Sequence, residues 1–243
     1  MLDICLLGTG GMMPMPSRFL TSMLARLNGR LALIDCGEGT QVTMKMLGWG
    51  FKAIDVICIT HFHADHISGL PGLLLTIGNA GRTEPLKMVG PVGLQKIVEG
   101  LTIIAPELPF EIEFMELDKD APNPVRVGEF EIHHCMADHM VRCHAYRIDL
   151  NRKGKFDVKK AEALQLPKPL WGRIQKEGSV EHEGKTYTAE LVLGEPRKGI
   201  SVAYCTDSRP VDRIMQFVKG VQLFICEGMY GEEDKKQKAR ENK

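Results

Sequence analysis

Apolar runs of four to six residues recur along the chain, and each is followed by a side chain that could serve as a metal ligand or as an acid. The four clearest runs precede Asp35, His61, Asp207 and Glu227, and they cover residues 31–34, 56–59, 201–205 and 221–226. Continuous apolar strands indicate a sheet that is covered on both faces. In such folds, functional groups gather at the carboxyl ends of the strands, so the pattern predicts one site that draws on all four runs.

Helical patterns lie between these runs. Three segments have helical spacing: residues 41–47, 68–78 and 92–101. Thr40 is the expected N-cap of the first helix and Gly48 its expected end. Two further segments alternate as half-buried strands do: residues 111–116 and 129–135. We therefore expect an α/β (α+β) fold in which sheets are sandwiched between helix layers, in a single domain over residues 1–243.

Residues 151–190 differ from the rest of the chain because they are polar, turn-rich and without strong periodicity. Residues 142–177 carry ten Lys and Arg against four Asp and Glu, which leaves a local excess of about six positive charges. Two interpretations are open for this segment: a solvated surface excursion, or an arm that contacts a phosphate backbone.

The composition is typical of a soluble globular protein, with 44% hydrophobic and 26% charged residues. Lys and Arg balance Asp and Glu at 31 each, so only a local patch could hold a polyanion. The start of the chain has neither a basic segment nor a long apolar stretch, and we expect no signal peptide and no membrane association. Seven cysteines without a Cys-x-x-Cys pair favour free thiols in the cytoplasm. Cys36 and Cys205 are interpreted as buried thiols, with metal ligation as the alternative.

The segment Thr-His-Phe-His-Ala-Asp-His at residues 60–66 is the strongest chemical feature of the chain. It places three imidazoles and a carboxylate within six consecutive positions, and these are the ligand groups that zinc and its first-row neighbours prefer. In extended geometry His61 and His63 point the same way, whereas Asp65 and His66 follow a turn. We therefore expect one loop to supply two neighbouring metal ions, rather than a polar loop with incidental histidines.

Together these segments resemble the metallo-β-lactamase superfamily and, within it, the ribonuclease Z branch, the nucleases that process tRNA 3′ ends. The resemblance covers essentially the whole chain, and its motifs lie at residues 8–11, 33–41, 61–66, 138–148 and 204–210. Residues 154–178 are similar to the protruding tRNA-binding arm of this branch. The resemblance implies a four-layer αββα sandwich, a homodimer, and a tRNA precursor as substrate.

The resemblance also implies a set of metal ligands. One divalent metal ion would be held by His61, His63 and His139. A second ion would be held by Asp65, His66 and a further histidine, with Asp207 bridging the two. Zinc is the expected metal, and manganese and iron are the alternatives.

Further roles follow for residues around the metals. Asp35 would fix a ligand imidazole in one orientation, Asp65 would orient the attacking water, and Glu227 would orient a catalytic histidine. Three basic residues are expected to bind substrate: Arg18, Lys153 and Lys155. The remaining histidines near the site are expected on strands or at the surface: His133, His134 and His144.

The chain departs from the ribonuclease Z pattern in three places. Pro16 and Phe19 stand where that branch usually carries a lysine and an asparagine. A Lys-Pro pair replaces the usual Gly-Pro pair of the arm. The sequence also ends at Lys243, before the last metal histidine of the family. We therefore expect either a fragment of a longer polypeptide or a second metal site short of one ligand, with slow turnover by the 243-residue form.

The predicted activity is hydrolysis of a phosphodiester at the 3′ end of tRNA precursors, by a water that two metal ions about 3.5–4 Å apart activate. One alternative is a hydrolase of the same fold that acts on a small phosphodiester or an ester, which Pro16 and Phe19 favour. Another is a nucleic-acid-binding protein without catalysis, in which the metal is structural. The complete His-x-His-x-Asp-His loop argues against this last alternative, because structural zinc sites are closed and hold one ion.

Overall fold

The computed structural model describes residues 1–13, 15–105, 107–152, 154–195 and 197–228. The chain divides into two compact units, one made of Met1–Asp149 with Ser201–Lys243 and the other of Leu150–Ile200. Each unit has a hydrophobic core of its own. Within the described ranges, no helix combines the length and the apolar character that crossing a membrane requires.

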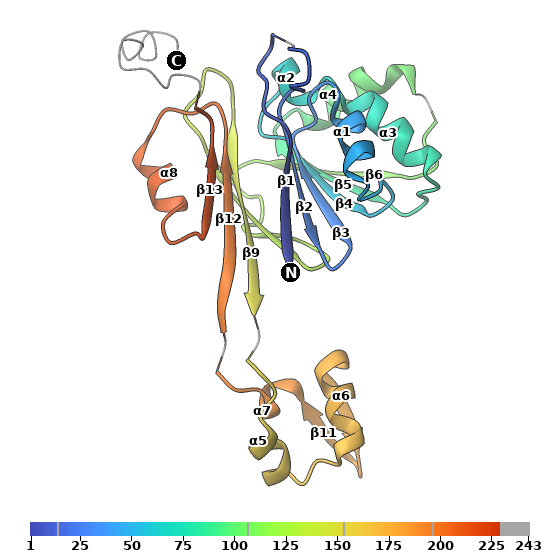
Figure 1. Cartoon of the computed structure of the whole chain (residues 1–243), viewed down its shortest axis with the longest axis vertical. Coiled ribbons are helices and arrows are strands. Elements are labelled where there is room, and N and C mark those ends of the chain that lie inside the picture. The colour runs from blue at the N-terminus through green and yellow to red at the C-terminus, as the bar shows by residue number, and fades with distance from the viewer. Residues whose placement is uncertain (14, 106, 153, 196, 229–243) are drawn as a thin grey trace. The chain divides into compact units, whose positions relative to one another are not determined.

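The larger unit contains a six-stranded sheet whose strands lie in chain order (Figure 1). They are β1 (Leu2–Gly8), β2 (Ser22–Leu27), β3 (Arg30–Ile34), β4 (Ile54–Cys58), β5 (Leu86–Pro91) and β6 (Ile112–Leu117). Strands β1 to β3 pair antiparallel, and β3 to β6 run parallel. Because β3 and β4 are parallel neighbours, Asp35 and Thr60 leave the sheet at the same edge.

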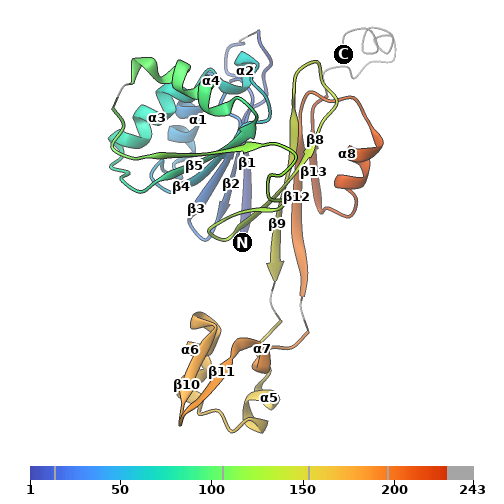
Figure 2. The same ribbon diagram turned by 180° about the vertical axis from the view of Figure 1, so that it is seen from behind.

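Helices cover one face of this sheet (Figures 1 and 2). They are α1 (Thr40–Leu47), α2 (Ala64–Ile67), α3 (Leu70–Asn79) and α4 (Leu94–Leu101), with a short 3-10 helix, η1 (Thr102–Ile104). Leu33 and Ile57 of the sheet and Leu70 and Leu74 of α3 are fully buried in the core between these layers. Each such side chain contributes about 1.5–3 kcal/mol on burial, and this packing holds α3 and the loop before it against the sheet.

The start of α1 differs from the expectation. Gly39, and not Thr40, is the N-cap, with a left-handed φ of 88°. Thr40 is the first helical residue, and its hydroxyl donates to the carbonyl oxygen of Gly37 at 2.7 Å. The ring of Phe19 lies against Gly39, where an added β-carbon would come within 2.0 Å of it. Gly48 ends the helix, as predicted.

A second sheet, of five strands, faces the first (Figures 1 and 2). Its order is β13 (Leu223–Cys226), β12 (Arg197–Cys205), β9 (His144–Arg152), β8 (Phe130–Met136) and β7 (Val125–Val127). The hydroxyl of Tyr146 on β9 donates to the carbonyl oxygen of Ile59 at 2.7 Å and so joins the two sheets. Helix α8 (Asp212–Phe217) packs through Ile214 against Cys143 and Cys205. The layers therefore follow the expected order of helices, sheet, sheet and helix.

The smaller unit consists of short helices and a hairpin. Its elements are α5 (Val158–Ala163), α6 (Lys168–Glu177), β10 (Ser179–His182), β11 (Lys185–Thr188) and α7 (Ala189–Val192). Ala161, Ile174 and Val192 meet in its core, and Asp157 caps α5 by accepting from two backbone N–H groups. Sequence spacing predicts none of these elements, because helices this short depend on their mutual packing rather than on propensity.

Candidate metal centre

Four side chains that follow strand ends converge in the larger unit. They are His61, His63, His139 and Asp207, and one ligand atom of each lies within 4.8 Å of the others. The first two come from the loop after β4, the third from the loop after β8, and the last from the loop after β12. These side chains lie together at strand ends, which is where the pattern of apolar runs ending in polar groups predicts a site.

The imidazole nitrogens of this cluster are close together. Nε2 of His61 lies 3.0 Å from Nδ1 of His63, and Nε2 of His139 lies 3.3 Å from that same Nδ1. Nε2 of His61 is also 3.1 Å from Oδ2 of Asp207. A neutral imidazole has a single N–H, so three rings and a carboxylate offer more lone pairs than protons. This donor set fits a divalent metal ion.

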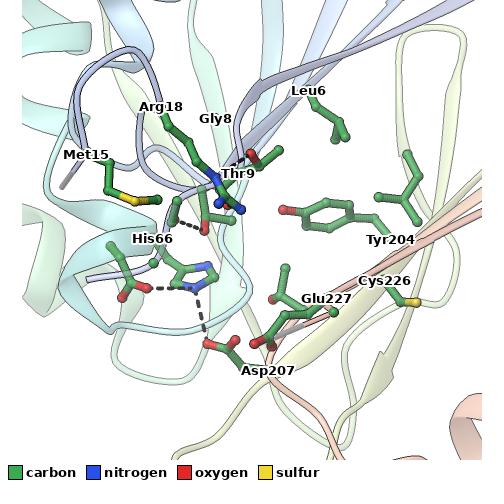
Figure 3. A pocket seen from close by; sticks show the side chains of 17 residues that line it. Leu6, Gly8, Thr9, Met15, Arg18, His66, Tyr204, Asp207, Cys226 and Glu227 are labelled. Carbon is green, nitrogen blue, oxygen red and sulfur yellow. Dashed lines mark hydrogen bonds and ion pairs between the residues drawn. The ribbon is translucent and has the colours of Figure 1, made fainter. Parts of the chain in front are cut away.

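Asp65 and His66 lie beside this cluster, and Figure 3 shows His66 next to Asp207. Nε2 of His66 is 3.2 Å from Oδ2 of Asp207 and 3.7 Å from Oδ2 of Asp65. A single oxygen of Asp207 therefore lies close to two imidazole nitrogens, one from His61 and one from His66. All six residues that the sequence suggested as metal ligands are gathered here, and their roles as ligands stay a prediction.

Asp35 is fully buried behind the cluster. Its Oδ2 lies 2.7 Å from Nδ1 of His66, which leaves Nε2 of that ring facing Asp207. Its Oδ1 accepts from the backbone N–H of Thr60 at 2.7 Å, and the Thr60 hydroxyl lies within 3.0 Å of both carboxylate oxygens. That hydroxyl is also 3.0 Å from Nδ1 of His61. Sequence reasoning missed Thr60, although its place between a buried strand and the first histidine was an available signal.

The pKa values of these groups follow from their contacts. Burial alone would lower the pKa of His66, but Asp35 and Asp207 raise it to about 10. Burial alone would raise the pKa of Asp207, but hydrogen bonds with His61 and His66 hold it well below its usual range. Burial and the neighbouring His61 lower the pKa of His63. A metal ion bound here must displace the proton of His66, so metal uptake increases with pH.

A cavity of about 430 Å³ opens beside the cluster (Figure 3). Its wall includes Asp65, His66, Asp207, Tyr204, Glu227, Met15 and Arg18. Arg18 is held in place by Thr9, whose carbonyl oxygen accepts from its Nη2 at 2.8 Å. Two residues that the sequence suggested for catalysis and for substrate binding, Glu227 and Arg18, thus share this cavity with the cluster.

Comparison with known proteins identifies the family. The ribonuclease Z of Clostridium acetobutylicum is 52% identical over 248 residues, and the match covers 100% of this chain and 80% of the relative. The chain belongs to the ribonuclease Z family. A family model described as the anti-Pycsar protein Apyc1 also matches, over residues 2–97.

Solved structures agree with this membership at the level of the fold. The short form of human tRNase Z has a TM-score of 0.67 and 22% identity, and covers 100% of this chain and 83% of its own. YhfI of Bacillus subtilis, a metallo-β-lactamase-fold protein, has a TM-score of 0.58 and 16% identity, over 92% of this chain and 70% of its own. The expected αββα metallo-β-lactamase fold is thereby confirmed, and this member of the family is a metal-dependent hydrolase.

Among the described residues, three others singled out from the sequence do not belong to the cluster: Cys36, Lys155 and Cys205. Lys155 is exposed in the smaller unit, and Lys153 falls outside the described residues. Cys36 and Cys205 are buried free thiols, and burial raises the pKa of each. Neither belongs to the ligand group, in agreement with the interpretation as buried thiols.

His144 is a buried imidazole on β9. Its backbone N–H donates to the carbonyl oxygen of Thr60 at 3.0 Å, but neither ring nitrogen has a hydrogen-bond partner among the described residues. Burial, reinforced by His134 and Arg142, lowers the pKa of His144 to about 4. His133 and His134 lie on the adjacent strand β8.

We expect His144 to make the fold less stable in acid. An unfolded histidine has a pKa of about 6.5, so between pH 6.5 and 4 the unfolded chain takes up a proton that the folded chain excludes. The contribution of His144 is complete above pH 6.5, and the free energy of unfolding should fall by up to about 3 kcal/mol as the pH drops towards 4. Urea unfolding of metal-free protein at pH 7.5 and pH 4.5 measures this loss.

Two variants separate this effect from other titrations. His144→Leu removes the titrating group without breaking a ring hydrogen bond, so its loss of stability in acid should be smaller than that of the wild type by the same amount. The control variant His182→Gln, on β10, should lose as much unfolding free energy in acid as the wild type does. Equal losses in the wild type and in His144→Leu would contradict the assignment.

Proposed function

We propose that this protein is a two-metal endonuclease that cleaves tRNA precursors at their 3′ ends. The observation that carries the proposal is the position of Oδ2 of Asp207, 3.1 Å from Nε2 of His61 and 3.2 Å from Nε2 of His66. One carboxylate oxygen close to two imidazoles that are assigned to different ions is suited to be a ligand shared by the two ions. Membership of the ribonuclease Z family supports the substrate.

The two ions would be zinc, for which imidazole and carboxylate ligands are suitable, with manganese and iron as alternatives. The first ion would bind His61, His63 and His139, the second would bind Asp65 and His66, and Asp207 would serve both. When bound, the ions would polarise the phosphate and lower the pKa of a water molecule.

The chain's own residues supply positioning and proton transfer. Asp35 holds Nδ1 of His66, so that Nε2 of the same ring is presented to Asp207. Asp65 lies at the cavity wall, where its carboxylate can orient the attacking water and accept its proton. Glu227 lies on the same cavity wall as Asp207, and we assign it a positioning role.

The smaller unit would contact the tRNA backbone as an arm. Residues 150–200 contain eleven Lys and Arg against seven Asp and Glu, in a chain that is neutral overall. Lys153 and Lys155, at the start of this unit, are our candidates for phosphate contacts. Backbone contacts of this kind release counterions, so tRNA binding should weaken as salt rises.

Parallel assays of the full chain on a tRNA precursor and on bis(p-nitrophenyl) phosphate, with metal content measured alongside, test the proposal. We expect endonucleolytic cleavage of the precursor that chelation abolishes and metal restores. Activity on the small ester alone would instead indicate a small-phosphodiester hydrolase. Tight tRNA binding without cleavage would indicate a binding protein with a structural metal.

We further infer a cytoplasmic homodimer. All seven cysteines are free thiols, which suits a reducing compartment. The dimer rests on the resemblance to ribonuclease Z, and light scattering of the purified protein tests it, since a monomer mass would contradict it.

A further inference from the structure

Four exposed methionines lie in two loops next to the metal cluster. Met12, Met13 and Met15 belong to the loop between β1 and β2, and Met140 belongs to the loop between β8 and β9. Their exposed fractions are 59%, 79%, 46% and 79% in that order. We call these four residues the methionine rim. Core methionines of this protein, such as Met23, are almost completely buried, so packing does not account for the rim.

The first loop reaches the cluster and is fixed at its base. A β-carbon at Gly11 would lie 3.8 Å from Oδ2 of Asp65, so the residues next to it are close to the cluster. Met15 lines the cavity and lies beside Arg18 in Figure 3. The backbone N–H groups of Thr9 and Gly10 both donate to the carbonyl oxygen of Phe19, at 3.1 and 2.8 Å. These bonds hold the methionines of this loop at the edge of the site.

The second loop contains a member of the cluster, His139. Met140 directly follows His139, whose Nε2 is 3.3 Å from Nδ1 of His63. Asp138, the residue before His139, is hydrogen-bonded through its backbone. Its carbonyl oxygen accepts from the N–H of Arg209 at 3.0 Å, and its own N–H donates to the hydroxyl oxygen of Ser208 at 3.1 Å. Because Asp138 and His139, the two residues before it, are both anchored, Met140 stays at the edge of the site.

The chemistry of the rim suits flat aromatic groups. A thioether side chain is flexible and polarizable, and it makes favourable contacts with aromatic rings. It has no strong donor or acceptor, so it cannot read the hydrogen-bonding edge of a base. Proteins hold single-stranded RNA largely by contacts with the flat faces of bases, which every base offers. Exposed apolar side chains grouped beside a catalytic centre are typical of a ligand-binding surface.

We propose that Met12, Met13, Met15 and Met140 receive the unpaired nucleobases on either side of the scissile phosphate, without selecting their sequence. This inference rests on the proposed function, because it names how the substrate of that same site is held. Arg18, on the cavity wall beside Met15, supplies the positive charge that the adjoining phosphates need.

Two quadruple variants of the full chain test the rim. Replacing all four methionines with glutamine keeps their length but removes their apolar character, and replacing them with leucine keeps the apolar character. For a tRNA precursor, we expect KM to rise about tenfold in the glutamine variant, equivalent to about 1.4 kcal/mol, and to stay within about twofold in the leucine variant. Met46→Gln and Met215→Gln, at exposed positions outside both loops, serve as matched controls. Metal content should be unchanged in every variant.

A precursor with abasic residues on both sides of the cleavage site identifies the contact. The wild type should already bind this substrate about tenfold more weakly, and the glutamine variant should lose nothing further. The proposal would be overturned if the glutamine variant kept the wild-type KM for the normal precursor. It would also be overturned if the glutamine substitutions weakened binding of the abasic precursor as much as they weaken binding of the normal precursor. Fluorescence anisotropy with the same two RNAs gives the same comparison without cleavage. If the wild type does not cleave the precursor, the proposed function is wrong. The anisotropy comparison of the two RNAs then still tests whether the methionine rim binds nucleobases.

Discussion

Asp207→Asn is expected to remove most of the metal-dependent phosphodiesterase activity. Oδ2 of Asp207 lies close to Nε2 of both His61 and His66, and its low pKa keeps the carboxylate ionised at any working pH. An asparagine at this position offers a neutral oxygen and an N–H group that faces the imidazoles. We expect kcat/KM to fall by on the order of 10²–10⁴, the range that a positioned electrostatic or acid–base group contributes, and the amount of bound metal to fall with it.

The measurement is steady-state cleavage of a tRNA precursor together with metal analysis of the same samples. Asp118→Asn is the matched control, because it removes one carboxylate at an exposed position after β6. It should keep both wild-type activity and wild-type metal content. If Asp207→Asn kept full metal content and lost less than about tenfold in activity, the shared-ligand role of Asp207 would be wrong.

The parts of the site that could be predicted from sequence are those that the chain specifies locally. His61, His63, Asp65 and His66 lie within six residues, so their common loop fixes them near one another whatever the remaining fold. Asp207 is distant in sequence, and its assignment needed the pattern of apolar strands ending in polar groups together with the family resemblance. The structure brings its carboxylate to the same place because β12 and β4 both end at that edge of the fold.

The parts that could not be predicted depend on tertiary contacts. Thr60 joins Asp35 to the metal loop only because β3 and β4 are parallel neighbours, a pairing that spacing along the chain does not contain. The N-cap of α1 is Gly39 rather than Thr40, and this position requires glycine because its φ is 88° and the ring of Phe19 occupies the space of a β-carbon, a contact that spacing does not show. The helix predicted over residues 68–78 is α3, which begins at Leu70, whereas the short helix α2 before it is not predicted by the spacing.

Asp35→Asn is expected to weaken metal binding while leaving the local backbone conformation intact. Asp35 has a φ of 60°, a left-handed conformation that asparagine adopts readily. The carboxylate holds His66 and both the N–H and hydroxyl groups of Thr60, and an amide has only one oxygen to offer them. Loss of such an orienting partner typically lowers metal affinity 10–100-fold. The buried donors left without a partner should cost about 1–3 kcal/mol of stability.

The pH dependence of metal binding distinguishes this role from general destabilisation. In the wild type, Asp35 and Asp207 raise the pKa of His66 to about 10 despite its burial, so metal affinity should keep rising with pH up to that value. Removing the charge of Asp35 lowers the pKa of His66, and the rise in affinity should end at a lower pH in the variant. Asp3→Asn, which breaks a partly exposed ion pair with Arg26, should leave the profile unchanged. A variant profile that runs parallel to the wild type would mean that Asp35 only stabilises the fold and does not set the protonation of His66.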